Sequence, residues 1–295
     1  HAYDLWIMVN VADILGYSDD AVVYWQKYAE RKNFFNKTFV SAITHKTVKS
    51  DGTLMYTQTS YAVPLALGIF SEENIPYAAK YLADACVRKN TDDNKIEYNS
   101  YALMTGFIGT VWISKALSDN GYTDIAYKML ENTNYPSWLY PVEQGATTMW
   151  ERLDSYTKER GFGGNNSMNS FNHYSFGSVG AWFYNYSLGI QRDQVSPGFK
   201  HFILQPQPDF KGSMKSASGY YDSSYGRIDN NKWFYKATVP ANTSATLYLP
   251  INKEATVLES GKPLTESEGV VFIKYEKGKA VYHLQSGIYQ FTIKM

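Results

Sequence analysis

The residues best suited to chemistry lie in one short segment, 143–156, whose sequence is Glu-Gln-Gly-Ala-Thr-Thr-Met-Trp-Glu-Arg-Leu-Asp-Ser-Tyr. Carboxyl groups are common general acids and bases, because small changes in their surroundings set whether they hold or release a proton. Glu151 stands between Trp150, a ring able to exclude water, and Arg152, a cation able to tune a neighbouring charge. The segment therefore predicts an acid–base site with Glu151 as its first candidate.

The other acids of this segment have less specific interpretations. Asp154 follows Glu151 by three residues, so one turn of helix would place both on one face. We expect Asp154 to cap the turn or to pair with Arg152, and a direct ligand contact is the alternative. Glu143 fits the surface of a loop. Glu151 itself has a structural alternative, an ion pair with Arg152, because structural pairs also perturb acids.

The segments on either side are rich in aromatic residues. Tyr135-Pro-Ser-Trp-Leu-Tyr-Pro141 precedes the acids, and a Gly/Asn-rich stretch, 161–167, follows them. Long loops in compact domains are usually functional or disordered, and this aromatic content argues against disorder. Trp138 and Trp150 suit a buried core and the wall of a binding site equally well. His173, at the start of the next expected helix, is either a satisfied polar residue or a hydrogen-bonding group in the site.

Composition narrows the kind of partner. The 295 residues carry no net charge and 44% are hydrophobic, so the chain can build a large core but lacks the basic surface that nucleic acids or anionic membranes require. Aromatic residues make up 16% of the chain. Such rings stack on sugars, although an ordinary core explains the same number. We see no membrane-spanning run, no metal-ligand spacing and no phosphate loop, and we expect no cofactor.

The first two thirds of the chain has helical periodicity. Helices are expected at 3–15, 18–39, 59–70, 71–89, 105–117, 123–134 and 170–189. The first carries an apolar stripe of Leu5, Met8, Ala12 and Leu15, and the fourth should turn Tyr77 and Cys86 inward. Helix pairs of this kind suit an α/α toroid with site loops on one face. A right-handed solenoid is the alternative, but no fixed-period repeat supports it.

Near Val195 the pattern changes to the two-residue period of strands. Strands are expected at 202–204, 217–221, 225–228, 233–239, 245–249, 256–258, 270–275, 280–284 and 289–293. Short strands at this spacing indicate a β-sandwich. The sequence thus predicts an α+β multidomain fold, with part of a helical toroid in 1–195 and an antiparallel β-sandwich in 196–295.

Several ordered motifs resemble the large inverting family of bacterial α-L-rhamnosidases. They are Thr105-Gly-Phe-Ile-Gly-Thr110, Tyr135-Pro-Ser-Trp-Leu-Tyr140, Gly145-Ala-Thr-Thr-Met-Trp-Glu-Arg-Leu-Asp154, Met168-Asn-Ser-Phe-Asn-His-Tyr-Ser-Phe-Gly-Ser-Val-Gly180 and Pro197-Gly-Phe-Lys200. The resemblance covers essentially the whole chain. It implies an (α/α)6 barrel followed by a β-sandwich, and hydrolysis of terminal α-L-rhamnosides from a rhamnose-containing glycan or glycoside.

The resemblance also implies roles for individual residues. Glu151 matches the general base that activates water, and His173 matches a residue lining the sugar subsite. Trp138 matches an aromatic wall, with Trp150 as a further substrate-binding candidate, while Arg152 and Asp154 are expected to support the base. The chain departs from the family at Ala181, where the family usually has Glu within Gly-Glu-Trp.

The family's general acid lies in an Asp-x-x-x-x-Glu motif in the first half of the barrel, which we expect upstream of His1. The chain begins within a helical pattern and without a targeting signal, so we expect a fragment or processed product, and periplasmic, extracellular and cytoplasmic locations stay open. Apolar helix faces such as 63–70 should then be exposed, leading to self-association or to binding of the missing N-terminal half. The alternatives are a non-catalytic carbohydrate-binding or structural fragment, and a toroid glycosidase for another sugar.

Overall fold

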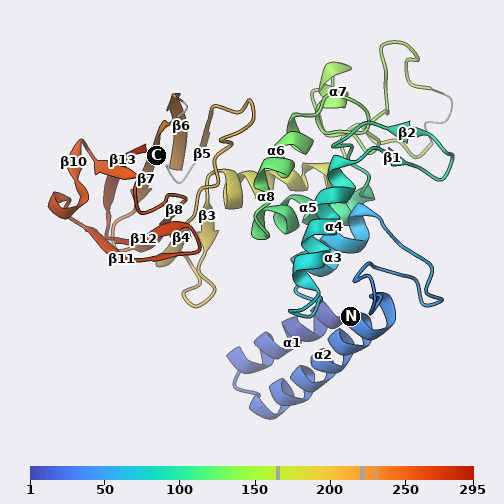
Figure 1. Cartoon of the computed structure of the whole chain (residues 1–295), viewed down its shortest axis with the longest axis horizontal. Helices are drawn as coiled ribbons and strands as arrows, with labels where there is room; N and C mark the ends of the chain where they lie inside the picture. Colours follow the sequence, from blue (N-terminus) through green and yellow to red (C-terminus); the bar gives the residue numbers. More distant parts are fainter. Residues whose placement is uncertain (164–166, 220–222, 230) are drawn as a thin grey trace. The chain divides into compact units, whose positions relative to one another are not determined.

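The computed structural model describes residues 1–163, 167–219, 223–229 and 231–295 (Figure 1). The chain divides into two compact units, 1–177 and 178–295. The first is mainly helical and the second mainly β-structure. The predicted fold class, helix pairs of a toroid followed by a β-sandwich, is confirmed.

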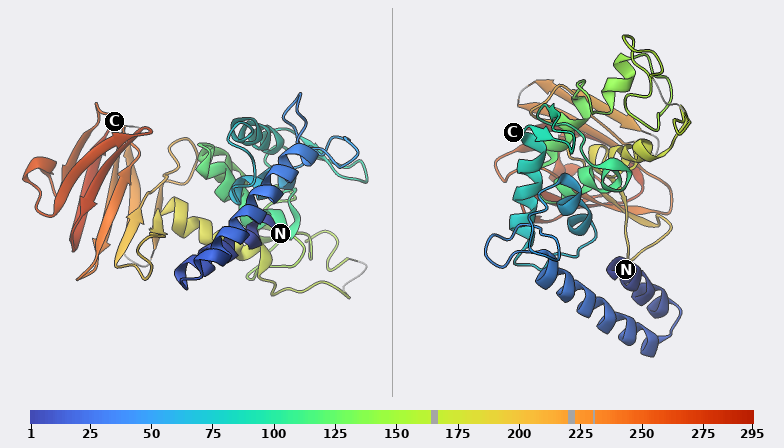
Figure 2. Two further views of the ribbon diagram at one scale, coloured as in Figure 1. Left: turned by 90° about the horizontal axis from the view of Figure 1, so that it is seen from below. Right: turned by 90° about the vertical axis from the view of Figure 1, so that its right-hand side faces the viewer.

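The first unit is built from helix pairs. Its elements are α1 (Ala2–Ile14), α2 (Ser18–Phe39), α3 (Gln58–Ala66), α4 (Ile75–Val87), β1 (Asn90–Thr91), β2 (Glu97–Tyr98), α5 (Gly106–Asp119), α6 (Thr123–Glu131) and α7 (Leu139–Glu143). Helices α1 and α2 form an antiparallel hairpin, and α3 packs against both α4 and α5 (Figures 1 and 2). Each helix expected before residue 135 is present, with α4 starting later and α3 and α6 ending earlier than predicted.

Helix α3 is buried, as its all-round apolar sequence predicts. The Thr57 side chain accepts a hydrogen bond from the Ser60 backbone and so caps the helix. The predicted exposure of 63–70 is wrong for the end of the segment, where Ile69 and Phe70 are buried, whereas Val63, Leu65 and Leu67 are half-buried. Helix α2 covers this segment: Phe35 packs edge-on against Phe70, and the Asn36 amide donates to the Ile69 carbonyl.

The predicted inward faces of two other helices, α1 and α4, need correction. In α1, Leu5 and Ala12 are buried, but Met8 and Leu15 of the same stripe are exposed. The hairpin packs through a small cluster centred on Leu5, Tyr28 and Ile69, which leaves much of its length in contact with solvent. In α2, Val22, Trp25 and Ala29 share that exposure. In α4, Cys86 is buried as expected, whereas Tyr77 is 44% exposed and stacks on the His45 ring.

The helix expected at 170–189 begins only at Ser175. It consists of a 3-10 turn (Ser175–Ser178), α8 (Val179–Trp182) and a π-helical turn (Phe183–Ser187). Residues 170–173 instead contain a bend, and their backbone forms hydrogen bonds with residues 149 and 151. Gly189 ends the π turn with φ +77°, and a Cβ there would lie 2.1 Å from the Pro206 nitrogen, so only glycine fits.

The second unit is a two-sheet sandwich. Its strands are β3 (Ile190–Arg192), β4 (His201–Leu204), β5 (Ser216–Gly219), β6 (Ser223–Asp229), β7 (Lys232–Val239), β8 (Ser244–Leu249), β9 (Thr256–Glu259), β10 (Lys262–Pro263), β11 (Val270–Glu276), β12 (Lys279–Leu284) and β13 (Gly287–Lys294). One sheet has the order β10-β9-β13-β7-β6-β5 and the other β11-β12-β8-β4-β3.

Both sheets contribute to one core, including Leu204 and Leu247 from one and Tyr235 and Phe291 from the other. Each predicted strand is present, although residues 220 and 221 of the second lie outside the described residues. Strands β4 and β8 pair in parallel, which is the one departure from antiparallel pairing among the described strands.

Candidate active site

Two segments that are distant in sequence hold the candidate base. The backbone N–H of Glu151 donates to the Ser170 carbonyl over 2.8 Å, and the Ser170 N–H donates to Glu151 Oε2 over 2.8 Å. The backbone N–H of His173 donates to the Met149 carbonyl, also at 2.8 Å. The structure therefore brings Glu151 and His173, the two central predicted site residues, onto paired segments.

His173 is held by a stacking ring and by its own backbone. Phe107, in the first turn of α5, stacks on its imidazole with the centroids 4.8 Å apart and the planes at 19°. The Ser175 N–H donates to His173 Nδ1 over 3.4 Å. In the neutral ring this bond places the proton on Nε2, which is then a hydrogen-bond donor.

Trp138 and Trp150 lie inside the unit. They are 5% and 6% exposed. The Trp138 indole N–H donates to the Phe176 carbonyl over 2.9 Å, and Trp150 packs edge-on against Phe171. In this chain the two rings brace the loops that carry Glu151 and His173. Their predicted contact with sugar stays a prediction.

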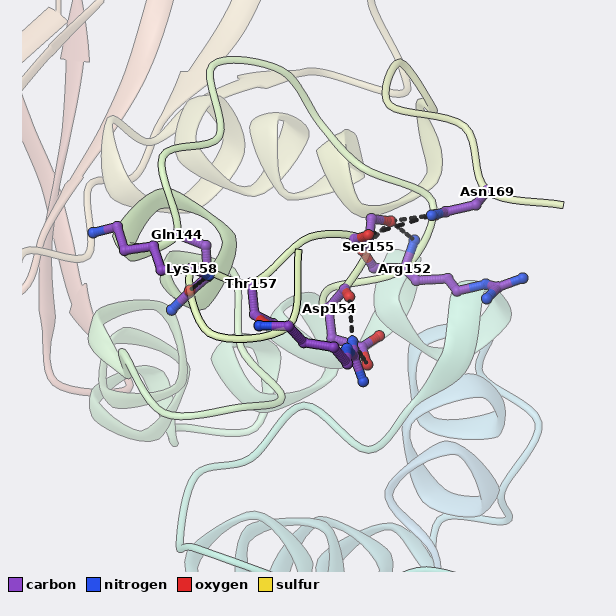
Figure 3. A network of polar contacts seen from close by, with 8 residues as sticks. Gln144, Arg152, Asp154, Ser155, Thr157, Lys158 and Asn169 are labelled. Atoms are coloured by element: carbon purple, nitrogen blue, oxygen red, sulfur yellow. Dashed lines mark hydrogen bonds and ion pairs between the residues drawn. The ribbon is translucent and has the colours of Figure 1, made fainter. Parts of the chain in front are cut away.

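Arg152 and Asp154 belong to a polar network that ties the loops together (Figure 3). The Arg152 guanidinium donates to the Met168 carbonyl over 2.6 Å. Asp154 pairs with Arg160, with 3.0 Å between Nη2 and Oδ2. The hydroxyl of Ser155 links the network by bonding the Arg152 carbonyl and the Asn169 amide oxygen. Arg152 and Asp154 thus fix the loop, and Asp154 pairs with Arg160 and not with Arg152, the expected partner.

The 151–155 segment consists of bends and turns, so the helical turn that would place Asp154 above Glu151 does not form. Glu143 is exposed, as expected, although it ends the short helix α7 and is not in a loop.

Three tyrosines lie beside this network: Tyr135 and Tyr140 belong to the aromatic motif noted in the sequence, whereas Tyr98 had no distinct sequence signal. Tyr135 packs edge-on against Tyr98 and Tyr140, with centroids 5.8 and 5.3 Å away. Burial raises the pKa of Tyr135 to about 12, and the nearby Asp154 charge adds to the shift. Phe107 was also missed. Its motif, Thr105–Thr110, was noted for the family resemblance, but a contact with His173 leaves no local pattern.

Two Asp-x-x-x-x-Glu spacings occur within the chain, at Asp92/Glu97 and Asp154/Glu159. The structure commits most of these acids to structural bonds. Asp92 accepts backbone N–H groups within its turn, Glu97 pairs with Lys89, and Asp154 pairs with Arg160. The general acid expected upstream of His1 therefore stays a prediction.

None of the helices that the structure describes has both the length and the apolar content to cross a bilayer. Within the same residues, no three His, Cys, Asp or Glu side chains gather as metal ligands would.

Helix pairs followed by a two-sheet sandwich, with a carboxylate and an imidazole on loops of the helical unit, form the architecture of helical-hairpin glycosidases. Residues 1–187 match the bacterial alpha-L-rhamnosidase 6 hairpin glycosidase domain, and residues 189–263 match the bacterial alpha-L-rhamnosidase C-terminal domain. The chain belongs to the bacterial alpha-L-rhamnosidase family.

The individual proteins that this chain resembles support the same family. An alpha-L-rhamnosidase of Formosa agariphila is 33% identical over 99% of this chain. The crystal structure of the Streptomyces avermitilis alpha-L-rhamnosidase complexed with L-rhamnose has a TM-score of 0.77 at 28% identity over 99% of the chain. An alpha-L-rhamnosidase structure from Dictyoglumus thermophilum has a TM-score of 0.79 at 28% identity over the whole chain. The chain spans only 30%, 26% and 31% of these relatives, respectively.

Proposed function

We propose that this chain carries the water-activating part of an enzyme that hydrolyses terminal α-L-rhamnosides with inversion. In inverting glycosidases one carboxylate deprotonates water on one face of the sugar, while a carboxylic acid protonates the leaving oxygen on the other. Glu151 is the base in this proposal, and His173 Nε2 donates a hydrogen bond to a sugar hydroxyl. The observation that carries the proposal is the backbone pairing that holds these two residues together.

The geometry suits a general base. The Ser170 N–H fixes Oε2 of Glu151, while Oε1 accepts no hydrogen bond from the residues that the structure describes. A carboxylate held by one oxygen keeps the lone pairs of the other for a water molecule. Glu151 is half-buried, so that water is partly shielded from bulk solvent.

The general acid comes, in this proposal, from polypeptide outside this chain. The relatives, named as alpha-L-rhamnosidases, are between three and four times as long as the stretch matched here, which leaves room for further catalytic residues. Asp154 is a poor candidate because its charge is already paired with Arg160. No cofactor is required, since the reaction needs only proton transfers and water.

An aryl α-L-rhamnoside assay tests the proposal, using the chain alone and a longer polypeptide that contains it. We expect turnover by the longer form, with the inverted anomer appearing first in a proton NMR time course. If both forms are folded and inactive, the hydrolase proposal is wrong and a carbohydrate-binding or structural role takes its place. Faster turnover of an aryl glucoside or glucuronide would instead exclude rhamnose as the substrate.

A further inference from the structure

A polar pocket of about 520 Å³ lies in the helical unit where α4 ends and α5 begins. Its lining includes Tyr56, Arg88, Lys89, Asp92, Asp93 and Met104. This volume falls within the range of small-molecule sites. None of these residues belongs to the candidate active site described above.

Arg88 enters the pocket in a fixed orientation. Its Nη2 donates to the Tyr56 carbonyl over 2.6 Å, and its Nε donates to Asn90 Oδ1 over 3.2 Å. The guanidinium carbon lies 4.0 Å from the Tyr56 ring centroid. Asn90 is buried and bonds the Ala85 carbonyl, so it anchors the arginine. Within the described residues Nη1 of Arg88 donates no hydrogen bond, which leaves it as a pre-oriented donor for a ligand.

A further part of the lining comes from the turn that joins β1 to β2. Asp92 Oδ1 accepts the backbone N–H groups of Asn94 and Ile96, both at 2.9 Å, and Oδ2 accepts the Tyr98 hydroxyl at 3.0 Å. These three bonds make the turn rigid. Asp93 follows directly, exposed and without a hydrogen bond to any described side chain or backbone group, so its carboxylate is an acceptor in the lining.

Two sets of neighbouring residues link the pocket to the candidate active site. Met104 precedes Phe107 by three residues, and Phe107 stacks on His173. Tyr98, which bonds Asp92, packs against Tyr135 at the start of the aromatic loops. These contacts place the pocket on the side of the helical unit where Phe107 and Tyr135 lie.

The chemistry of the lining favours a neutral, hydroxyl-rich ligand. Lys89 is paired with Glu97, so Arg88 stands beside the two carboxylates of Asp92 and Asp93, and the lining has no excess of positive charge that would select an anion. Donors beside acceptors match vicinal sugar hydroxyls, each of which donates and accepts. Met104 adds an apolar surface for the C–H face of a ring. We propose that this pocket is a second sugar subsite, which binds a neutral pyranose unit attached to the terminal rhamnose. This inference rests on the proposed function.

Calorimetric binding to the 295-residue chain tests the subsite, with methyl α-L-rhamnoside and an α-L-rhamnosyl-glucose disaccharide as probes. We expect the disaccharide to bind more tightly than the monosaccharide. Asp93→Ala and Arg88→Lys should each weaken only the disaccharide, by about five- to tenfold, since each removes a hydrogen bond with a charged group. Lys80→Ala, an exposed substitution on α4 outside the pocket lining, is the matched control and should change neither affinity.

Asp93→Ala separates loss of binding from loss of folding. The Asp93 side chain is exposed and forms no hydrogen bond or ion pair with the described residues, so its removal should not unfold the unit. A disaccharide that binds no more tightly than methyl α-L-rhamnoside overturns the subsite, even where rhamnoside hydrolysis is confirmed. So does an unchanged disaccharide affinity in both pocket variants. Absence of binding and turnover for every rhamnoside would instead remove the proposed function itself.

Discussion

Glu151 and Ser170 exchange two hydrogen bonds of 2.8 Å, one between their backbones and one from the Ser170 N–H to the Glu151 carboxylate. The side chain of the candidate base is thus oriented by the backbone of the segment that carries His173. A glutamine at 151 can accept the same N–H bond through its amide oxygen. Charge can therefore be removed from this position with little change in geometry.

Glu151→Gln should lower kcat for an aryl α-L-rhamnoside by about 10²–10⁴-fold, because loss of a general base typically costs that much. The measurement uses the longer polypeptide in which turnover is seen. Glu143→Gln is the matched control, since this exposed acid ends α7 eight positions earlier, and its kcat should not change. Near-normal turnover by Glu151→Gln would exclude the base role.

His173→Phe should raise KM about tenfold, because the aromatic ring keeps its stacking on Phe107 but loses the Nε2–H donor. The thermal midpoint should stay near that of the parent. His173→Ala loses both the donor and the stacking, so it should raise KM and also lower the midpoint. An unchanged KM in both variants would place His173 outside the sugar site.

The stability of the β1–β2 turn should depend on the ionisation of Asp92 at acidic pH. The Ile96 backbone N–H, the largest cause, holds the pKa of this carboxyl below its ordinary 3.8. A carboxyl group whose pKa is lower in the folded than in the unfolded state stabilises the fold. This stabilisation is fully present above about pH 4 and is lost as the pH falls through the pKa of the folded state. The Ile96 amide proton shift should therefore titrate with a midpoint below 3.8. Asp92→Asn should abolish this titration, and a midpoint above 3.8 in the parent would contradict the hydrogen-bonded turn.

Cys86 should not react with thiol reagents in the native chain. Its side chain is fully buried, and burial raises the pKa of the thiol, so both access and thiolate are lacking. Maleimide labelling should be on the order of 10²-fold slower in buffer than in 6 M urea, because it requires opening of the fold. Equal rates in both conditions would show that the α4 packing is wrong.

Gly189→Ala should destabilise the second unit by about 1–3 kcal/mol, because it adds a Cβ at φ +77° against the Pro206 backbone. Gly180→Ala is the matched control within α8, where no atom lies within 4 Å of the added Cβ. A helical Gly→Ala change of that kind is neutral or stabilising by up to about 1 kcal/mol. Urea unfolding followed by tryptophan fluorescence measures both, and equal midpoints would contradict the close approach at Gly189.

The residue pattern along the chain was enough to locate the helices and strands and to give their order. Helical and two-residue periods located α1–α6 and the strands of the sandwich, since these periods record which positions face a neighbour. The family motifs likewise pointed to the segment of Glu151 and to His173, because they are local runs of residues. The burial of Cys86 also followed from its apolar surroundings at helical spacing.

The partners that those positions contact depend on how the elements pack together in the folded chain. Periodicity identifies an apolar face but not the element that packs against it. The sequence therefore did not predict that α2 covers Phe70, or that Leu15 is exposed to solvent. The links of Glu151 to Ser170, Asp154 to Arg160 and Phe107 to His173 join residues whose spacing carries no period. Such contacts depend on how the loops close after the helices have packed, and local sequence does not encode that closure.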